Sequence, residues 1–385
     1  MDSRIGRAGL SEHAAITPHT GIGKKINIIT KLKSLIIKNR QKTMTSTAAY
    51  IKAPWRTELR NVELPAHPPC GWVRLRIDAC GICGTDVSAA INGAENWQPF
   101  GHEIAGTVVA VGDGVDTKRL PEGTTVVVES ASACGLCDSC RNVRADLCQG
   151  GAPNIWGQPA LGFSTFMDAP ACACVPYSGL EPEVASLVEP AGVAFDMVLA
   201  ADIKMGDRVC VVGPGPIALV AVALAFRRGA SEVVCIGRKH SKARLALAEM
   251  LGAMICHSED KKGLDALKGK FNHVLMTAPV DAIPGALEYL AYGGIMTYIG
   301  IGTGDPVISF DANDFHFRKL QLRASYASPA MYFPAVISLM KSGAIPGKAL
   351  ISHRLPLGQI QHALDLNRNN KSEVIKIVVI PEGAE

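Results

Sequence analysis

The stretch "DRVCVVGPGPIALVAVALAFRRGASEVVCIG", residues 207–237, decides the fold of this chain. It begins with a short apolar run, passes two glycines into a longer segment that is apolar on all sides, and ends with a second short apolar run. Short apolar runs bounded by turn residues are typical of buried strands, and the longer segment has the length of a helix. A strand, a helix and a strand at this spacing predict a parallel sheet with helices on both faces.

The same alternation continues further along the chain. "SKARLALAEMLGA" (241–253) is typical of a helix, and "FNHVLMTA" (271–278) is typical of a strand. "AIPGALEYLAYGG" (282–294) suggests a helix that ends in glycines, and "IMTYIGIG" (295–302) suggests another strand. We therefore expect an α/β protein with a doubly wound parallel-sheet domain over residues 196–335.

The N-terminal half of the chain has a different pattern. Segments such as "GWVRLRIDA" and "IAGTVVAVGDGV" are short strand-like runs separated by glycines and prolines. Short strands with frequent turn residues predict a barrel-like β domain. Near the C-terminus, "EVIKIVVI" (373–380) is a further strand that could return to this domain. We expect the β domain to comprise residues 45–195 and 336–385.

Length and charge set limits on the function. The chain has 385 residues and a net charge of +4, and residues 1–43 alone contain nine Lys or Arg against two acidic residues. The rest of the chain is therefore mildly acidic, which argues against a nucleic-acid partner. No run of about 18 consecutive apolar residues occurs, so we expect no membrane span.

The basic N-terminal extension, residues 1–44, contains the amphipathic stretch "INIITKLKSLIIKNR". Three interpretations compete: an untranslated or disordered extension that precedes a working start at Met44, a mitochondrial presequence, and a segment that lies on a membrane surface. We expect it to be disordered and exclude it from the fold. The predicted location is cytoplasmic, or mitochondrial if the extension is a presequence.

Twelve cysteines suggest a reducing compartment in which some thiols bind metal. Four of them lie in "CGLCDSCRNVRADLC", and four thiolates on one short loop can close a tetrahedral shell around a structural zinc ion. A two-disulfide knot and an iron–sulfur cluster are the alternatives for this loop. The four residues are Cys134, Cys137, Cys140 and Cys148.

A second group of metal-binding residue types is spread along the β domain. "ACGICGTDV" (79–87) holds Cys80 and Cys83, "FGHEIAG" holds His102 and Glu103, and "LVEPAG" holds Glu189. Thiolate, imidazole and carboxylate together are the mixed donors of a catalytic zinc that keeps one position open. The alternatives are a redox pair of cysteines, a core histidine and a helix-capping glutamate.

Taken together and in this order, these motifs resemble the zinc-containing medium-chain dehydrogenase/reductase family, in particular its polyol (sorbitol-like) and sugar dehydrogenase branch. The matching segments run from about Ala48 to Ile380. The resemblance implies a GroES-like β domain and a Rossmann domain. It also implies that the polar groups near "GICGTD" act on an alcohol.

The resemblance assigns the metal ligands by position. It makes Cys83 a ligand of the catalytic zinc and excludes Cys80, and it makes His102 the second ligand. Glu103 and Glu189 would supply the remaining oxygen, either directly or through water bound to the metal. The redox-pair interpretation fails because no thioredoxin-like context surrounds the two cysteines.

The resemblance also assigns two residues that assist the metal. Thr85 takes the place of the hydroxyl that accepts the proton of the alcohol, and Asp86 takes the place of the carboxylate that binds the zinc-ligating histidine. Ser88 departs from the pattern, because some relatives carry a histidine there that passes the proton onward. The segment "INGAENWQPF" (91–100) is expected to shape the substrate pocket, with Trp97 as a candidate wall.

Three small residues predict a dinucleotide site. Gly213, Gly215 and Ala218 form the pattern G-x-G-x-x-A between a strand and a helix. Gly213 would allow a tight turn, Gly215 would let the pyrophosphate approach the helix N-terminus, and Ala218 would allow close packing of helix on strand.

The end of the next strand predicts which dinucleotide binds. NAD-dependent enzymes normally carry an acidic residue there, but this chain has Gly237, Arg238 and Lys239, followed by Lys242 and Arg244. Cationic groups attract a 2′-phosphate, which a carboxylate would repel. We therefore expect NADP(H) to be preferred over NAD(H). The alternative is that these cations only coat the first turn of a helix.

The sequence thus predicts a zinc-dependent oxidoreductase that transfers a hydride between a secondary alcohol, a polyol or a sugar, and NADP(H) or NAD(H). We expect two zinc ions per subunit, one catalytic and one structural, and by resemblance a homodimer or homotetramer. Two alternatives are a related enzyme acting on an amino-alcohol or an aldehyde, and a non-catalytic zinc-stabilised nucleotide-binding protein.

Overall fold

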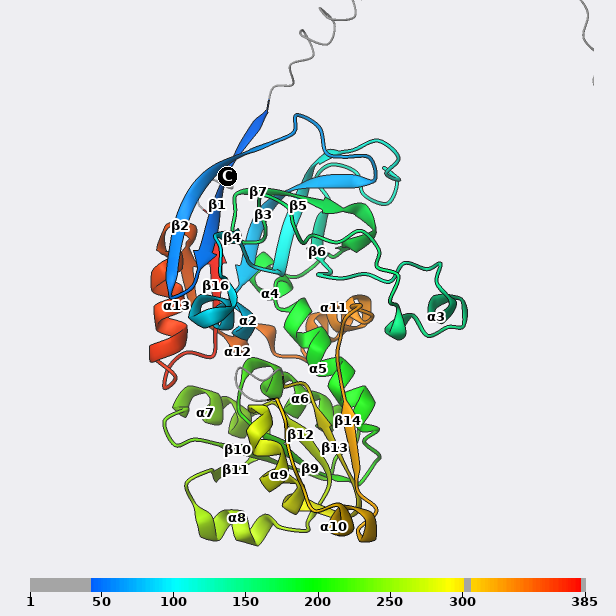
Figure 1. The fold of residues 1–385 in the computed structure, drawn as a ribbon, viewed down its shortest axis with the longest axis vertical. Helices are drawn as coiled ribbons and strands as arrows, with labels where there is room; N and C mark the ends of the chain where they lie inside the picture. Colours follow the sequence, from blue (N-terminus) through cyan, green and yellow to red (C-terminus); the bar gives the residue numbers. More distant parts are fainter. Residues whose placement is uncertain (1–42, 301–305, 382–385) are drawn as a thin grey trace, which may run out of the picture. The chain divides into compact units, whose positions relative to one another are not determined.

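The computed structural model describes residues 43–300 and 306–381 (Figure 1). The predicted N-terminal extension, up to residue 42, lies outside these ranges, and the first strand already begins at Met44. A β domain and a parallel-sheet domain follow each other along the chain. The structure and the neighbouring solved folds described below confirm the predicted α/β class.

The β domain is built around a seven-stranded sheet in the order β15-β16-β3-β5-β6-β8, with β7 paired to β3. A second, three-stranded sheet has the order β2-β1-β4. The helices of this domain are short apart from α13 (Ile360–Asn369). The strands are β1 (Met44–Lys52), β2 (Arg56–Leu64), β3 (Trp72–Gly81), β4 (Gln98–Pro99), β5 (Glu103–Val111), β6 (Thr125–Val128), β7 (Phe166–Pro170), β8 (Cys174–Pro176), β15 (Ile351–Pro356) and β16 (Lys376–Ile380).

The second domain is a six-stranded sheet in the order β11-β10-β9-β12-β13-β14, and all of its strand pairs are parallel. Its strands are β9 (Arg208–Val212), β10 (Glu232–Gly237), β11 (Met254–His257), β12 (Phe271–Met276), β13 (Leu290–Tyr298) and β14 (Gln321–Ala324). The helices are α6 (Pro216–Arg227), α7 (Lys242–Met250), α8 (Lys261–Leu267), α9 (Ile283–Ala286) and α10 (Ala312–Phe317).

One predicted element of this domain is wrong in part. The expected helix over residues 282–294 is reduced to α9 and one 3₁₀ turn, and β13 already begins at Leu290. Residues from Leu290 onward form a strand rather than a helix because Leu290 is fully buried beside β12, where it pairs with Phe271. Tertiary burial here outweighs the local preference for a helix.

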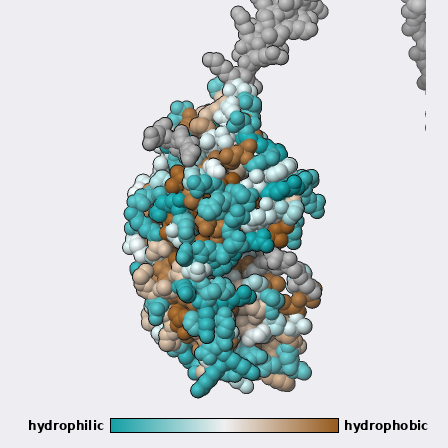
Figure 2. All heavy atoms as spheres, turned by 90° about the vertical axis from the view of Figure 1, so that its left-hand side faces the viewer, coloured by the Kyte–Doolittle hydropathy of each residue, from teal (hydrophilic) through white to brown (hydrophobic). Residues whose placement is uncertain are grey.

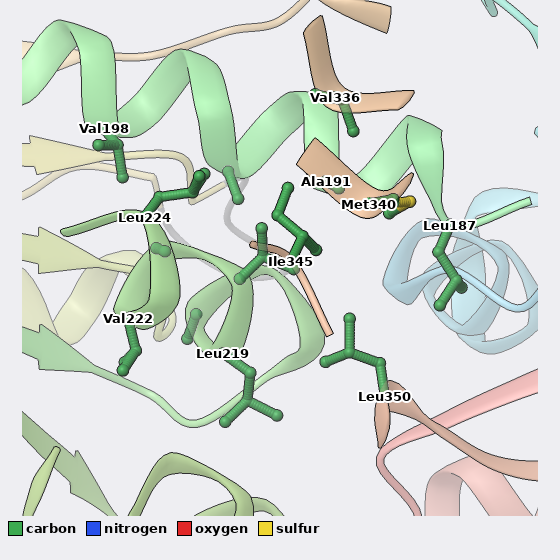
Figure 3. Packing of buried hydrophobic residues seen from close by; sticks show 14 of the residues in the cluster. Leu187, Ala191, Val198, Leu219, Val222, Leu224, Val336, Met340, Ile345 and Leu350 are labelled. Carbon is green, nitrogen blue, oxygen red and sulfur yellow. The ribbon is translucent and has the colours of Figure 1, made fainter. Parts of the chain in front are cut away.

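Two helices belong to both domains. The expected boundaries at 195/196 and 335/336 fall inside α5 (Val188–Ala201) and α11 (Phe333–Lys341). Both helices contribute to one hydrophobic cluster. The cluster also includes α6 and residues of the seven-stranded sheet of the β domain, such as Ala79 and Val127. Figure 3 shows this packing between helices. Because α5 is buried by neighbours from both domains, it is apolar on most of its surface.

The helical stretch Pro182–Ala201, which comprises α4 (Pro182–Ala185) and α5, is long and apolar enough to cross a membrane by length and composition alone. However, 67% of its most apolar window is buried inside the structure, so packing within the protein accounts for its hydrophobicity. The face of the molecule drawn in Figure 2 is mainly hydrophilic, with hydrophobic residues scattered over it.

The sheet register brings three distant segments together. Gly81 at the end of β3 faces Glu103 at the start of β5, and on its other side it faces Val378 of β16. The short helix α2 (Gly84–Ser88) follows β3 directly, and Gly101–His102 leads into β5. The chemistry-bearing residues of "GICGTD" and "GHE" therefore meet at this end of the sheet, beside the C-terminal strand.

A glycine substitution tests this arrangement. Gly101 and Gly123 both have positive φ, but a Cβ at Gly101 would meet the Phe163 ring at 2.6 Å, whereas nothing lies within 4 Å of one at Gly123. Gly123→Ala should cost about 1–2 kcal/mol from the backbone alone, and Gly101→Ala should cost a further ~1–3 kcal/mol from overpacking. Urea unfolding of both variants measures the difference, and equal losses would contradict the close packing beside His102.

Candidate functional site

The four-cysteine loop forms a compact group of sulfur atoms around the short helix α3 (Asp138–Arg141). The Sγ of Cys137 lies 3.6 Å from that of Cys140 and 3.8 Å from that of Cys148, and the Sγ of Cys148 lies 3.5 Å from that of Cys134. A tetrahedron of thiolates at about 2.3 Å from a metal has edges of about 3.8 Å. A disulfide would need about 2.0 Å, so the geometry favours a metal over the two-disulfide knot.

Backbone amides of the same loop donate hydrogen bonds to two of these sulfurs, those of Cys134 and Cys148, whereas burial raises the pKa of Cys140. The N–H of Cys134 donates to the Sγ of Cys148 at 3.3 Å, and this bond is the main cause that lowers the pKa of Cys148 to about 6. The N–H groups of Leu136 and Cys137 both donate to the Sγ of Cys134 at 3.4 Å. The loop is therefore arranged to hold charged sulfur ligands.

A second group of ligand atoms lies where β3 ends and β5 begins. One ligand atom each of Cys83, His102 and Glu103 lies within 4.8 Å of the others. Cys83 is the N-cap of α2, and His102 and Glu103 are buried. A sulfur, a nitrogen and an oxygen donor in one place fit a zinc ion that retains an open coordination position.

The Glu103 carboxylate has one satisfied oxygen and one unsatisfied oxygen. Oε1 accepts a hydrogen bond from the Nζ of Lys376 at 2.5 Å, and Nζ also donates to the carbonyl of Ile82 at 2.7 Å. Oε2 is buried without a hydrogen-bond partner among the described residues. A buried carboxylate oxygen without a partner is costly, and a cation beside Cys83 and His102 would relieve that cost. These residues therefore fit a bound metal.

Glu189 lies at the first turn of α5, outside this three-residue group among the residues that the structure describes. Burial raises the pKa of its carboxyl to about 7, opposed by the charge of His102 and reinforced by that of Glu103. The charge of Glu189, which lies on α5, thus interacts with His102 and Glu103. Its role as an oxygen ligand, direct or through water, which the resemblance implies, stays a prediction.

The carboxylate of Asp86 binds the backbone of Cys83 and lies near the imidazole of His102. Its Oδ2 accepts from the backbone N–H of Cys83 at 2.8 Å, and its Oδ1 lies 3.9 Å from the Nδ1 of His102. Burial raises the pKa of Asp86, while His102 and the Cys83 N–H act in the opposite direction. A carboxylate on the Nδ1 side leaves the Nε2 of the imidazole for a metal.

Two further buried residues lie close to this group of ligand atoms. Cys80 lies in the hydrophobic core of the β domain, and burial raises the pKa of its thiol well above the ordinary value. Lys376 was missed, although it reaches the centre of the site. Its signal was present: it is a single charged residue inside the apolar run "VIKIVVI" (374–380), and such a buried charge needs a partner.

Two cavities meet at Thr85. One, of about 420 Å³, also contains His102 and Trp156 in its wall, and the other, of about 680 Å³, contains Cys83 and the strand-end residues Thr277 and Gly300 of the second domain. Thr85 is exposed to both. Thr85 is thus accessible from both cavities, one lined by His102 and the other by Cys83.

The structure corrects the prediction that Trp97 forms a wall of the substrate pocket. Trp97 does not line either of these cavities; it packs against Arg56 and Arg60, whose guanidinium carbons lie 5.8 and 5.3 Å from its ring. Trp156 lines the first cavity instead, with its ring centroid 5.9 Å from that of His102. Sequence reasoning gave no reason to choose Trp156, because the segment around it has no distinctive pattern.

The glycine motif occupies the turn between β9 and α6. Gly213 has φ +96°, and a Cβ there would lie 2.9 Å from the backbone nitrogen of Ala278, so only glycine fits. Gly215 is the N-cap of α6 and has open space around it, and Ala218 is fully buried. The turn thus offers room for a pyrophosphate at the N-terminus of a twelve-residue helix.

The cations after β10 are only partly free. Gly237 ends the strand, and Arg238 and Lys239 are exposed beside it. Arg244 is instead half-buried, and its Nε donates to the carbonyl of Val374 at 2.7 Å. The backbone N–H of Lys239 donates to the carboxylate of Glu259. Arg238 and Lys239 therefore remain the candidates for a phosphate contact.

Two family models match the chain, and they correspond to the two domains. "Alcohol dehydrogenase GroES-like domain" matches residues 69–179, and "Zinc-binding dehydrogenase" matches residues 216–342. The chain belongs to the zinc-containing medium-chain dehydrogenase/reductase family. The resemblance predicted from the motifs is confirmed, and the chain is an oxidoreductase of this family.

Curated relatives cover most of the chain. L-threonine 3-dehydrogenase of Bacillus licheniformis is 32% identical over 80% of this chain and 91% of its own length. L-galactonate-5-dehydrogenase of Escherichia coli is 29% identical over 79% and 90%, respectively. Sorbitol dehydrogenase of Bacillus subtilis is 27% identical over 80% and 90%.

Among solved structures, the alcohol dehydrogenase TADH from Thermus sp. ATN1 superposes with a TM-score of 0.77 at 26% identity, over 87% of this chain and all of the other. The 2R,3R-butanediol dehydrogenase from Bacillus subtilis gives a TM-score of 0.76 at 24% identity over 88% of this chain. Both comparisons support the two-domain medium-chain dehydrogenase fold.

The Lys376–Glu103 pair is testable by substitution. Lys376→Met removes the only cation that the structure places on the Glu103 carboxylate, so unfolding in urea with EDTA present should show a loss of about 3–5 kcal/mol. The double variant with Glu103→Gln should lose less, because no buried charge remains. Lys348→Met is the matched control, because its partner Glu181 is exposed and such pairs contribute at most about 1 kcal/mol. Similar losses for Lys348→Met and Lys376→Met would contradict the pair's importance.

Proposed function

We propose that this protein is a zinc-dependent dehydrogenase that transfers a hydride between a secondary alcohol of a polyol or sugar and a nicotinamide cofactor, with NADP(H) preferred. The observation that carries the proposal is the mixed group of Cys83, His102 and Glu103, which lies beside Thr85 where two cavities meet. One cavity opens within the β domain, and the other reaches the strand ends of the Rossmann domain.

The chain's own residues supply binding, orientation and proton transfer. Zinc held by Cys83, His102 and a carboxylate would provide a Lewis acid that polarises the alcohol oxygen. The exposed Thr85 hydroxyl, reachable from both cavities, relays the proton: it accepts the proton that the alcohol gives up as it donates its own to solvent. We propose that Asp86, whose Oδ1 lies 3.9 Å from the Nδ1 of His102, orients the imidazole by its charge.

The onward route of the proton differs from that of relatives with a histidine relay. Ser88 lines the larger cavity, and its hydroxyl donates to the carbonyl of Gly84 at 3.2 Å. A serine has no titratable group near neutral pH and cannot store the proton. We propose that solvent in this cavity takes it from Thr85.

The substrate class rests on the relatives. Sorbitol dehydrogenase and L-arabinitol 4-dehydrogenase of Aureobasidium melanogenum, 27% and 29% identical, act by name on polyols. The 32% identity to L-threonine 3-dehydrogenase supports an amino-alcohol as the second candidate substrate. A screen of polyols, sugars and L-threonine with both cofactors, followed by the absorbance of the reduced nicotinamide, separates the two. Inactivity on all of them would contradict the proposed function.

We further propose that the catalytic and structural sites each bind one zinc ion. Elemental analysis should find two zinc ions per wild-type chain and one each in Cys83→Ser and Cys137→Ser. Cys83→Ser should lose turnover by roughly a hundredfold or more while it stays folded, because its metal serves the reaction. Cys137→Ser should mainly lose thermal stability. Cys172→Ser is the control, because Cys172 is an exposed free cysteine outside both groups.

The cofactor preference depends on the exposed cations after β10. Arg238→Ala should raise the KM for NADP roughly tenfold, because a charge-assisted contact to the 2′-phosphate is lost, and it should leave the KM for NAD nearly unchanged. Arg227→Ala, at the last turn of α6, is the control for a general loss of surface charge. An equal effect of Arg238→Ala on both cofactors would contradict the assignment.

A further inference from the structure

The cavity on the His102 side of the catalytic group has a distinctive lining. Three segments form it: α2 with its following turn, residues 98–102, and residues 156–161. Its volume of about 420 Å³ lies within the range of small-molecule pockets. Because Thr85 and His102 lie at its catalytic end, the reacting carbon of a substrate must lie there. The rest of the substrate must lie toward Trp156 and Gln158.

Trp156 presents an apolar face to this substrate. Its indole lies 5.9 Å from the His102 imidazole, centroid to centroid, with a tilt of 47°, while half of the residue (50%) remains exposed. The ring is thus held beside the metal ligand and still has an open face in the cavity wall. Such a face can pack against the C–H groups of a carbon chain that carries hydroxyl groups.

Two amide side chains complete the wall. Gln98 is exposed and Gln158 is half-buried, and neither side chain has a hydrogen-bond partner among the described residues. An amide offers both donors and an acceptor, which matches hydroxyl groups, since these also donate and accept. An indole face and two free amides in the same cavity wall therefore suit a polyhydroxy chain.

The charges around the cavity work against an anionic substrate. No Lys or Arg is found among the lining residues that the structure describes. The buried carboxylate of Asp86 is part of the wall, and Lys376 is already paired with Glu103. A carboxylate or phosphate group on the substrate would lose hydration here without gaining a cation.

We propose that this cavity selects an uncharged polyhydroxy alcohol over the sugar acid or sugar phosphate of the same carbon skeleton. Trp156 packs against its carbon chain, and Gln98 and Gln158 bind its hydroxyl groups. The inference rests on the proposed function and specifies the substrate class of the same site. It names specificity residues that neither the metal-ligand pattern nor the nucleotide motif includes.

The first experiment compares kcat/KM for hexitols and pentitols with the values for the matched aldonates and phosphate esters. We expect a preference of about a hundredfold for the neutral compounds. Gln158→Lys places a cation in the wall and should raise the ratio of aldonate to polyol kcat/KM about tenfold. A wild-type enzyme that uses aldonates or phosphates as well as polyols overturns the proposal, although the proposed dehydrogenase function would stand.

The second experiment isolates Trp156. Trp156→Ala should raise the KM for polyols about tenfold, whereas 2-propanol, which offers only two methyl groups to the ring and no longer carbon chain, should change by less than about twofold. Trp156→Phe should recover most of the loss, and Trp97→Phe, which alters a ring outside the cavity, is the matched control. A loss in Trp156→Ala that is equal for 2-propanol and polyols indicates a structural role and overturns the proposal.

A binding measurement keeps this test independent of turnover. Polyols should quench the tryptophan fluorescence of the zinc-loaded wild-type protein, and the matched aldonates should not. The quenching should disappear in Trp156→Phe but remain in Trp97→Phe. Selective quenching without turnover would support the inference while contradicting the proposed function, and quenching that is equal for aldonates and polyols would overturn the inference.

Discussion

The contact on which the site depends is the buried ion pair between Glu103 and Lys376. Both side chains are nearly inaccessible to solvent, and they come from β5 and β16, which are separated by most of the chain. The pair can form only because β16 returns to pair with β3 at Gly81, the residue that also faces Glu103. A Cβ at Gly81 would lie 2.0 Å from the Glu103 Oε2, so the close approach requires glycine there.

This ion pair also bears on the metal site. Oε1 is neutralised by Lys376, the other oxygen has no hydrogen-bond partner in the described structure, and the carboxylate as a whole lies beside the ligand atoms of Cys83 and His102. A buried carboxylate that is only half satisfied is a poor contributor to stability but a good ligand. Burial of the unpaired carboxylate oxygen therefore costs stability at a position where a bound cation can offset that cost. Glu189 adds negative charge from α5.

The two cavities explain why the catalytic group lies at the junction of the domains. The nucleotide turn belongs to the Rossmann sheet, and its ligand crevice opens at the carboxyl ends of β9, β12 and β13. The metal ligands belong to the β domain. Because α5 and α11 are packed into a core shared with both domains, the two halves of the site are held against each other by apolar burial.

Much of this protein was predictable from local pattern. The parallel sheet followed from the alternation that begins at residue 207, and the family followed from the order of its motifs, because periodicity and motif spacing are properties of the sequence itself. The metal-binding and nucleotide-binding roles of individual residues remain predictions, although the structure brings Cys83, His102 and Glu103 together. Tertiary structure alone decided the rest. It paired Lys376 with Glu103, kept Trp97 out of the two cavities and placed Trp156 beside His102. Contacts between segments far apart in the sequence depend on sheet register and packing, and no local pattern encodes these.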